Sequence, residues 1–151
     1  MAQIKISVQE HDFSVQNEYQ ALLGDHADSG AVVSFIGLVR DFNDGRDVTG
    51  LKLEHYPGMT EKALNDIATQ AAQRWSLNGI TIIHRVGQLQ LADQIVLVAV
   101  SSAHRGAAFQ ACEFVMDYLK TKAPFWKKET TQYGEFWVQA KSADDEKANR
   151  W

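Results

Sequence analysis

Four lysines surround a single proline in the second half of the chain and have the most evident chemical potential. They lie in segment 118–128, which reads YLKTKAPFWKK. Lysines in the last turn of a helix usually only complement the helix dipole, which does not explain Lys127 and Lys128 after the proline. A turn there can bring Lys120 and Lys127 together, and two close ammonium groups lower each other's pKa. A lysine with a lowered pKa can act as acid, base or nucleophile.

A histidine and an arginine stand side by side where a predicted strand is followed by a predicted helix. They belong to segment 101–106, SSAHRG. Free backbone N–H groups and the helix dipole favour an anion at a helix start, and His104 and Arg105 would strengthen a phosphate site there. A turn exposed to solvent explains this segment equally well.

Arg40 ends a strand predicted over residues 30–40 and is another candidate anion ligand. Gly37 is costly inside that strand unless another group approaches its backbone closely. An arginine can bind a phosphate through two hydrogen bonds. On these residues alone, a bulge followed by a surface arginine is the better interpretation.

Composition excludes several classes of protein. The 151 residues are 45% hydrophobic and 23% charged, which fits one globular domain over residues 1–151. The formal net charge of −4 argues against a nucleic-acid-binding protein with a broad basic face. The single cysteine, Cys112, excludes an intramolecular disulfide. It falls on the apolar face of a predicted helix, where a thiol is usually inert.

Membrane and metal signals are absent from the sequence. Residues 1–6 lack the long apolar stretch of a signal peptide. The longest apolar run, residues 95–100, is far too short to span a bilayer. No two of the five histidines have close metal-ligand spacing. We therefore expect a cytoplasmic protein without metal or cofactor that binds neither membranes nor nucleic acid.

The elements that must position these residues are mixed in type. Alternating and β-branched segments predict seven strands, at residues 4–8, 30–40, 51–56, 80–86, 94–101, 125–131 and 136–140. Apolar residues at helical spacing predict three helices, at residues 15–23, 59–75 and 106–123. We expect a polar loop at 41–50 and a polar C-terminal tail at 142–151. Because strands and helices do not alternate regularly, the fold is predicted as α+β, with two main helices on a mixed, largely antiparallel sheet.

Taken together, these segments resemble the large, catalytic subunit of molybdopterin synthase. The matching stretches are residues 30–40, LEHYPGM at 53–59, IHRVG at 83–87, SSAHR at 101–105 and MDYLKTKAPFWKKE at 116–129. Two of them, LEHYPGM and YLKTKAPFWKKE, are long and chemically unusual, which makes the resemblance specific. It covers about residues 30–140 and is looser at both ends.

The resemblance implies an α/β-hammerhead fold and a sulfurtransferase activity. It implies a central homodimer of large subunits, with a small ubiquitin-like carrier at each end, forming a heterotetramer. The C-terminal Gly-Gly of the carrier bears a thiocarboxylate, which delivers sulfur to cyclic pyranopterin monophosphate (precursor Z). Two transfers build the dithiolene of molybdopterin. The lack of a promising cysteine agrees with sulfur supplied by a partner.

The resemblance also implies roles for individual residues. Lys120 is expected to neutralise the thiocarboxylate and the oxyanion formed at its acyl carbon, and Lys127 to protonate or orient leaving groups on the pterin side. The residues alone leave this division between the lysines open. The groups expected at the substrate phosphate are Arg40, His104 and Arg105, with Lys128 bordering the same pocket. The family often has arginine near the position of Lys141, and the lysine here weakens any claim that this residue contributes.

Two other functions fit the same residues. A phosphate-ester hydrolase could use the basic pocket with water and would turn over without a protein partner. A non-catalytic module could bind a ubiquitin-like tail without forming a product.

Overall fold

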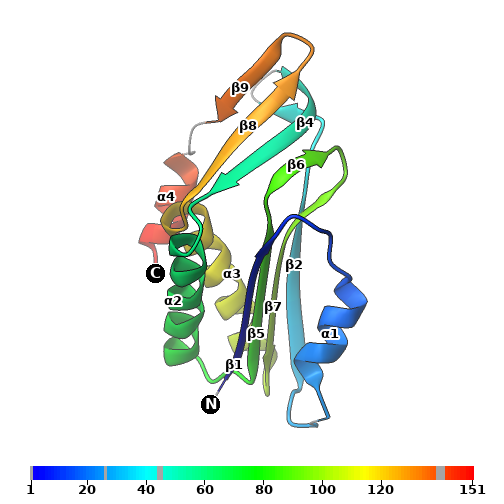
Figure 1. Cartoon of the computed structure of the whole chain (residues 1–151). Coiled ribbons are helices and arrows are strands. Elements are labelled where there is room, and N and C mark those ends of the chain that lie inside the picture. Colours follow the sequence, from blue (N-terminus) through cyan, green and yellow to red (C-terminus); the bar gives the residue numbers. More distant parts are fainter. Residues whose placement is uncertain (1, 26, 44–45, 139–141) are drawn as a thin grey trace.

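The larger sheet carries most of the core. The computed structural model describes residues 2–25, 27–43, 46–138 and 142–151, and Figure 1 shows their arrangement. The sheet has the order β1-β5-β7-β2, with strands β1 (Gln3–Gln9), β5 (Gly79–Arg85), β7 (Gln94–Ser102) and β2 (Ala31–Leu38). β1 is parallel to β5, and the other two pairs are antiparallel. The nearly continuous apolar sequences of β5 and β7 reflect their central position, because both faces of these strands are buried.

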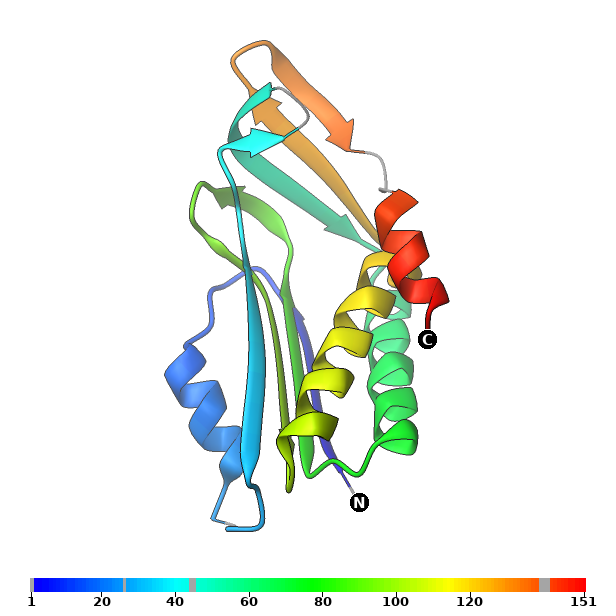
Figure 2. The same cartoon turned by 180° about the vertical axis from the view of Figure 1, so that it is seen from behind.

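Helices cover both faces of this sheet. α2 (Met59–Arg74) and α3 (Arg105–Lys122) lie on one face and α1 (Val15–Leu23) on the other, as Figures 1 and 2 show from opposite sides. Side chains of β7 alternate between the two layers. Val98 packs in the cluster with α2 and α3, whereas Leu97 packs in the cluster that includes Leu22 of α1. No helix in the described ranges is long and apolar enough to cross a membrane.

The second sheet stands beyond one end of the first (Figure 1). Its order is β3-β4-β8-β9, with β6 also paired to β4. The strands are β3 (Phe42–Asn43), β4 (Arg46–His55), β6 (Gly87–Gln90), β8 (Phe125–Thr131) and β9 (Gly134–Val138), and every pair is antiparallel. Leu51, Leu53 and Leu89 are the buried centre of this end of the molecule, with Val39 and Val86.

Thr60 connects the start of α2 to the end of α3. Its side chain is completely buried. Thr60 Oγ1 donates a hydrogen bond to the carbonyl oxygen of Pro124 (3.0 Å) and accepts one from the backbone N–H of Tyr56 (3.0 Å). β4 pairs with β8 directly beside this link, with His55 opposite Phe125. The two most unusual stretches of the sequence, 53–59 and 118–129, therefore meet in space.

Most of the predicted elements are confirmed. All seven strands and all three helices are present, and the α+β class with two main helices on a mixed sheet is correct. The predicted loop at 41–50 is wrong in part, since β3 and the first half of β4 lie there, and residues 44 and 45 fall outside the described ranges. This hairpin is held by backbone pairing, and its polar sequence has little of the apolar alternation from which strands are predicted.

The predicted polar tail is also wrong, because α4 (Ser142–Asn149) and the last two residues dock on α3. The Trp151 ring lies edge-to-face against Trp75, with centroids 5.6 Å apart. Trp151 Nε1 donates to Asp117 Oδ2 (2.6 Å), and Arg150 Nη2 donates to the same oxygen (3.0 Å). The sequence of α4 is polar, so the anchors that hold this segment are mainly the residues beyond the helix.

We predict that Asp117→Ala lowers the free energy of unfolding by about 1–3 kcal/mol, because Trp151 and Arg150 lose a buried acceptor. Urea denaturation followed by tryptophan fluorescence measures the change. Glu113→Ala is the matched control, since Glu113 contacts the same arginine from an exposed position and its loss should barely move the midpoint. Equal effects of the two substitutions would contradict a specific role for Asp117 in docking the C-terminus.

Candidate active site

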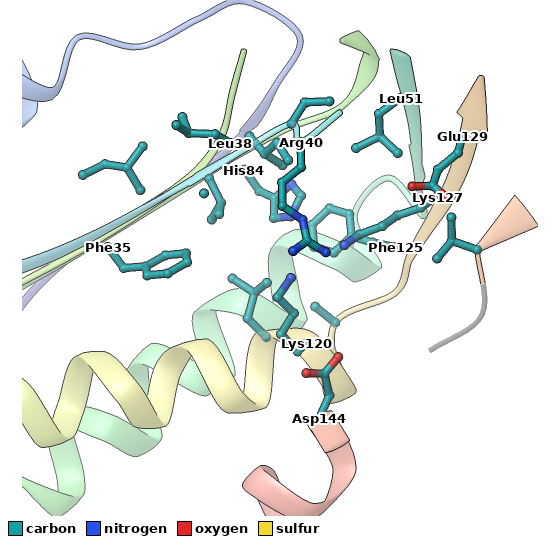
Figure 3. Close-up of a pocket in the computed structure, with 18 of the residues that line it drawn as sticks. Phe35, Leu38, Arg40, Leu51, His84, Lys120, Phe125, Lys127, Glu129 and Asp144 are labelled. Carbon is teal, nitrogen blue, oxygen red and sulfur yellow. The ribbon is translucent and has the colours of Figure 1, made fainter. Parts of the chain in front are cut away.

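A cavity of about 540 Å³ opens where the two sheets meet the C-terminal end of α3 (Figure 3). Apolar residues of β2, β7 and β8 form much of its wall, including Phe35, Ile95 and Phe125. The ionisable residues that line it are Arg40, His84, Lys120, Lys127, Glu129 and Asp144. Positive side chains therefore gather at this cavity, although the chain as a whole has a formal net charge of −4.

Lys120 and Lys127 reach this cavity from the two sides of the proline, as predicted from their spacing. α3 ends at Lys122, and Ala123 is extended (φ −87°, ψ 133°), as a residue before proline prefers. β8 begins at once, and its alternation directs Lys127 and Glu129 to the cavity side. In Figure 3 the cationic ends of Lys120, Lys127 and Arg40 point toward one another.

Arg40 also occupies the predicted position beside the cavity. One of the two interpretations of Gly37 applies in the structure. A Cβ on Gly37 would lie 2.8 Å from Cγ1 of Val96, so another group does approach the backbone closely. The pairing of β2 with β7 also shifts between Gly37 and Leu38, and the extra residue, Ile95, lies on β7. The irregularity is therefore in the partner strand, while the end of β2 brings Arg40 to the cavity.

Lys128 does not border the cavity, contrary to expectation. It follows Lys127 in the same strand and therefore lies on the opposite face of the sheet. Its Nζ is 3.2 Å from Glu135 Oε2 and 5.1 Å from the centroid of the Trp137 ring. Lys128 is thus part of a surface pair on the outer face. The alternation of β8 could have predicted this from the sequence.

His104 and Arg105 lie at the other end of α3 from Lys120 and do not line the cavity. His104 is the N-cap residue and Arg105 the first helical residue, and both are exposed. Arg105 precedes Lys120 by fifteen residues, or about 22 Å along the helix at about 1.5 Å per residue. One chain therefore does not bring the predicted phosphate ligands together. Lys141 lies outside the described residues.

The sequence analysis missed three ionisable residues of the cavity: His84, Glu129 and Asp144. Glu129 is buried and lies two residues after Lys127, so alternation was an available signal. Asp144 belongs to α4, in the segment predicted only as a polar tail. His84 was part of a stretch that carries the resemblance, but no role was assigned to it, and it stands in a strand whose residues are mostly buried.

His84 is a buried, neutral histidine. Its Nδ1 lies 2.8 Å from the carbonyl oxygen of Arg85, and its ring stacks on that of Phe125 with centroids 3.8 Å apart. Burial lowers the pKa of His84 to about 3, although the hydrogen bond to Arg85 opposes this change. The positive charges of Lys127 and Lys120 lower the pKa further. The imidazole is therefore uncharged at neutral pH.

Cys112 is buried on α3, as predicted, and it is not among the residues that line the cavity. Burial raises the pKa of its thiol to about 11. Its Sγ lies 3.8 Å from the carbonyl oxygen of Val98. Since the thiolate is the nucleophilic form of cysteine, this residue is poorly suited to carry sulfur.

Known proteins match both the sequence and the fold. The MoaE protein family matches residues 8–122. A molybdopterin synthase catalytic subunit of Vibrio cholerae is 56% identical and covers 97% of each chain. Among solved structures, the MoaE protein of Burkholderia ambifaria has a TM-score of 0.83 at 54% identity, covering 100% of this chain and 98% of its own. Molybdopterin synthase of Staphylococcus aureus has a TM-score of 0.80 at 34% identity, covering 92% and 98%.

These matches extend over the whole cavity. The family match includes Arg40, His84 and Lys120, and the full-length relatives extend it past Lys127. The similarity to the solved structures confirms the predicted fold. This chain belongs to the MoaE protein family, the family of molybdopterin synthase catalytic subunits.

Proposed function

We propose that this chain transfers sulfur from the C-terminal thiocarboxylate of a small ubiquitin-like carrier to precursor Z, forming the dithiolene of molybdopterin. The observation that carries the proposal is the convergence of Lys120, Lys127 and Arg40 in one cavity. Both reactants are anionic, one a thiocarboxylate and the other a cyclic phosphate ester. Three cations that converge on one cavity are suited to hold two such groups together.

A separate carrier is supported by two observations. The relatives are called catalytic subunits, which indicates that a further subunit completes their enzyme. The one cysteine of the sequence is buried away from the cavity, with a raised thiol pKa. The chain thus has no suitable sulfur donor of its own, and we place the reaction in the cytoplasm, where a thiocarboxylated carrier can be supplied.

The lysines serve two bond changes in each transfer. The carrier sulfur attacks a carbon of precursor Z, a C–S bond forms and a C–O bond breaks. Where the departing oxygen is a hydroxyl, we assign to Lys127 the proton with which it leaves as water; where it is an ester oxygen of the cyclic phosphate, it remains on phosphorus as that ring opens. Water then adds to the acyl carbon of the resulting thioester, and Lys120 stabilises the oxyanion. Collapse breaks the acyl C–S bond, leaving a thiolate on the pterin and a carboxylate on the carrier.

We further propose that His104 and Arg105 bind the substrate phosphate at the cavity of a second copy of this chain. Within one chain they lie about 22 Å from Lys120, so a shared phosphate requires a dimer. β2 lies at an edge of its sheet, and Phe35 and Leu38 on this strand are 41% and 52% exposed. An exposed edge strand with apolar side chains favours association with another chain.

A reconstituted reaction tests the function. The purified chain, mixed with thiocarboxylated carrier and precursor Z, should form molybdopterin, whereas carrier with an ordinary C-terminal carboxylate should not. Release of phosphate from substrate without any carrier would support a hydrolase instead. Carrier binding without product would support a non-catalytic module.

We predict that Lys120→Ala and Lys127→Ala each reduce single-turnover sulfur transfer by about 10²- to 10³-fold, because each removes a preorganised charge partner of the reacting groups. Lys128→Ala is the matched control, since Lys128 lies next to Lys127 but on the outer face of the sheet. It should retain nearly wild-type turnover. A folded Lys120→Ala protein with wild-type turnover would rule out the assigned role.

A mixture of two inactive variants tests the dimer. If Arg105 acts in the partner's cavity, Lys120→Ala and Arg105→Ala chains that exchange subunits should form mixed dimers with one intact cavity. Activity should then recover to about a quarter of the wild-type level at equal concentrations. Action within one chain predicts no recovery. Size-exclusion chromatography with light scattering must show that the mixed chains are dimeric.

Cys112→Ser should remain active, because the sulfur comes from the carrier. We expect a modest loss of thermal stability, since the change places a hydroxyl group in an apolar site. Turnover and a melting curve are measured on the same preparation. A well-folded, inactive Cys112→Ser protein would indicate a persulfide mechanism on this chain.

A further inference from the structure

The cavity wall contains a histidine that the mechanism above does not use. His84 is the sixth residue of β5 and is 4% exposed. Its ring lies nearly parallel to that of Phe125, with an interplanar angle of 18° and centroids 3.8 Å apart. Figure 3 shows both side chains within the group of residues that surrounds the cavity. A ring packed in this way cannot turn freely, so its two nitrogens have fixed positions.

The hydrogen bond at Nδ1 determines the tautomer of this ring. The Arg85 carbonyl oxygen, 2.8 Å away, can only accept a hydrogen bond, so Nδ1 carries the proton. Nε2 is then an unprotonated nitrogen with a free lone pair. Burial opposes a second proton, as do charges facing the ring from β8 (Lys127), α3 (Lys120) and β4 (His55). His84 therefore presents a neutral acceptor.

Nε2 has no donor within the described part of the chain. The contacts of His84 there are the Arg85 hydrogen bond and the Phe125 stack. Among the described residues, the fully enclosed side-chain atom without a partner is Ser101 Oγ, not His84 Nε2. His84 lines the cavity, and Nε2 is its ring nitrogen without a protein partner among the described residues. An acceptor in such a wall is stabilised when a ligand supplies the donor.

The chemistry of the reactants identifies the donor. A thiocarboxylate and an ionised phosphate only accept hydrogen bonds, and Lys120, Lys127 and Arg40 are donors that suit them. A pterin ring system carries N–H donors on its edge, which these cations cannot bind. Phe35 and Phe125 in the same wall suit a flat heterocycle. We propose that Nε2 of His84 accepts a hydrogen bond from a ring N–H of the pyranopterin substrate.

This contact would make His84 a substrate-binding residue that determines which edge of the heterocycle faces the two lysines. The inference rests on the proposed function and adds a contact to the neutral part of the substrate. The carrier tail also has peptide N–H groups, so the carrier is the alternative source of the donor. The experiment below distinguishes the two donors by measuring substrate and carrier affinities separately.

Two amide substitutions separate the nitrogens of His84. Asparagine reaches only the Nδ1 position, so His84→Asn can keep the donor to the Arg85 carbonyl while it removes the acceptor at Nε2. Glutamine reaches further, and His84→Gln can place an acceptor near Nε2. We expect His84→Asn to raise KM for precursor Z by about 3- to 10-fold, the effect of one neutral hydrogen bond. Carrier affinity should be unchanged, and His84→Gln, which restores an acceptor near Nε2, should raise KM for precursor Z less than His84→Asn does.

A measurement on the unmodified chain keeps the test valid if a variant fails to fold. In the full chain labelled with ¹⁵N-histidine and free of carrier, the Nε2 resonance of His84 should report an unprotonated nitrogen. Titration with precursor Z should shift this resonance, while the carrier alone should not. Three results would each overturn the inference: a protonated Nε2, a resonance that does not shift when substrate is added, or a His84→Asn variant that loses affinity for the carrier instead of the substrate. If the wild-type protein makes molybdopterin but the His84 resonance does not shift with substrate, only this inference fails. If the wild-type protein makes no molybdopterin, the proposed function fails.

Discussion

Pro124 determines where α3 ends, and the arrangement of the cavity depends on this one constraint. Proline disfavours helical geometry in the residue before it, so Ala123 is extended and β8 can begin at Phe125. Lys120 is then held on the last turn of a helix and Lys127 on a strand of the second sheet. Thr60 fixes the junction through its hydrogen bond to the Pro124 carbonyl. A helix that continued past residue 123 would separate the lysines and remove β8 from its pairing with β4.

The concentration of positive charge explains other features of the cavity. Cations close to one another in a partly buried site repel, and an ion moved out of water loses hydration. Glu129 and Asp144 lie in the same wall and reduce the local net charge. The anionic reactants would do the same when they bind. His84, by contrast, is neutral chiefly because it is buried, with a smaller contribution from these charges, so it suits a hydrogen-bond donor of the substrate and not its anionic groups.

Local features of the site could be predicted from the sequence, whereas features that depend on distant contacts could not. The sequence predicts that Lys120 and Lys127 lie close together, because Pro124 ends the helix between them within a few residues of both. The docking of the C-terminus depends on Trp151 and Asp117, which are 34 positions apart, so composition suggested only a polar tail. Arg105 was grouped with Arg40 through the resemblance, but the length of α3 places Arg105 about 22 Å from Lys120. The role of His84 depends on the cavity beside it, which distant segments of the chain form and the local sequence does not reveal.

The length of α3 has a consequence for assembly. Its C-terminal turn carries Lys120 and its first turn carries Arg105, so the helix holds two cationic groups about 22 Å apart. A rigid helix cannot bring its own ends together at one small substrate. Two copies related by a twofold axis can, because each supplies its first turn to the cavity of the other. The same α3 would then contribute to two cavities, and a dimer would be required for a complete phosphate site. β2 forms an edge of its sheet in the described part of the chain and leads directly to Arg40, so we propose this edge as the contact with the second copy.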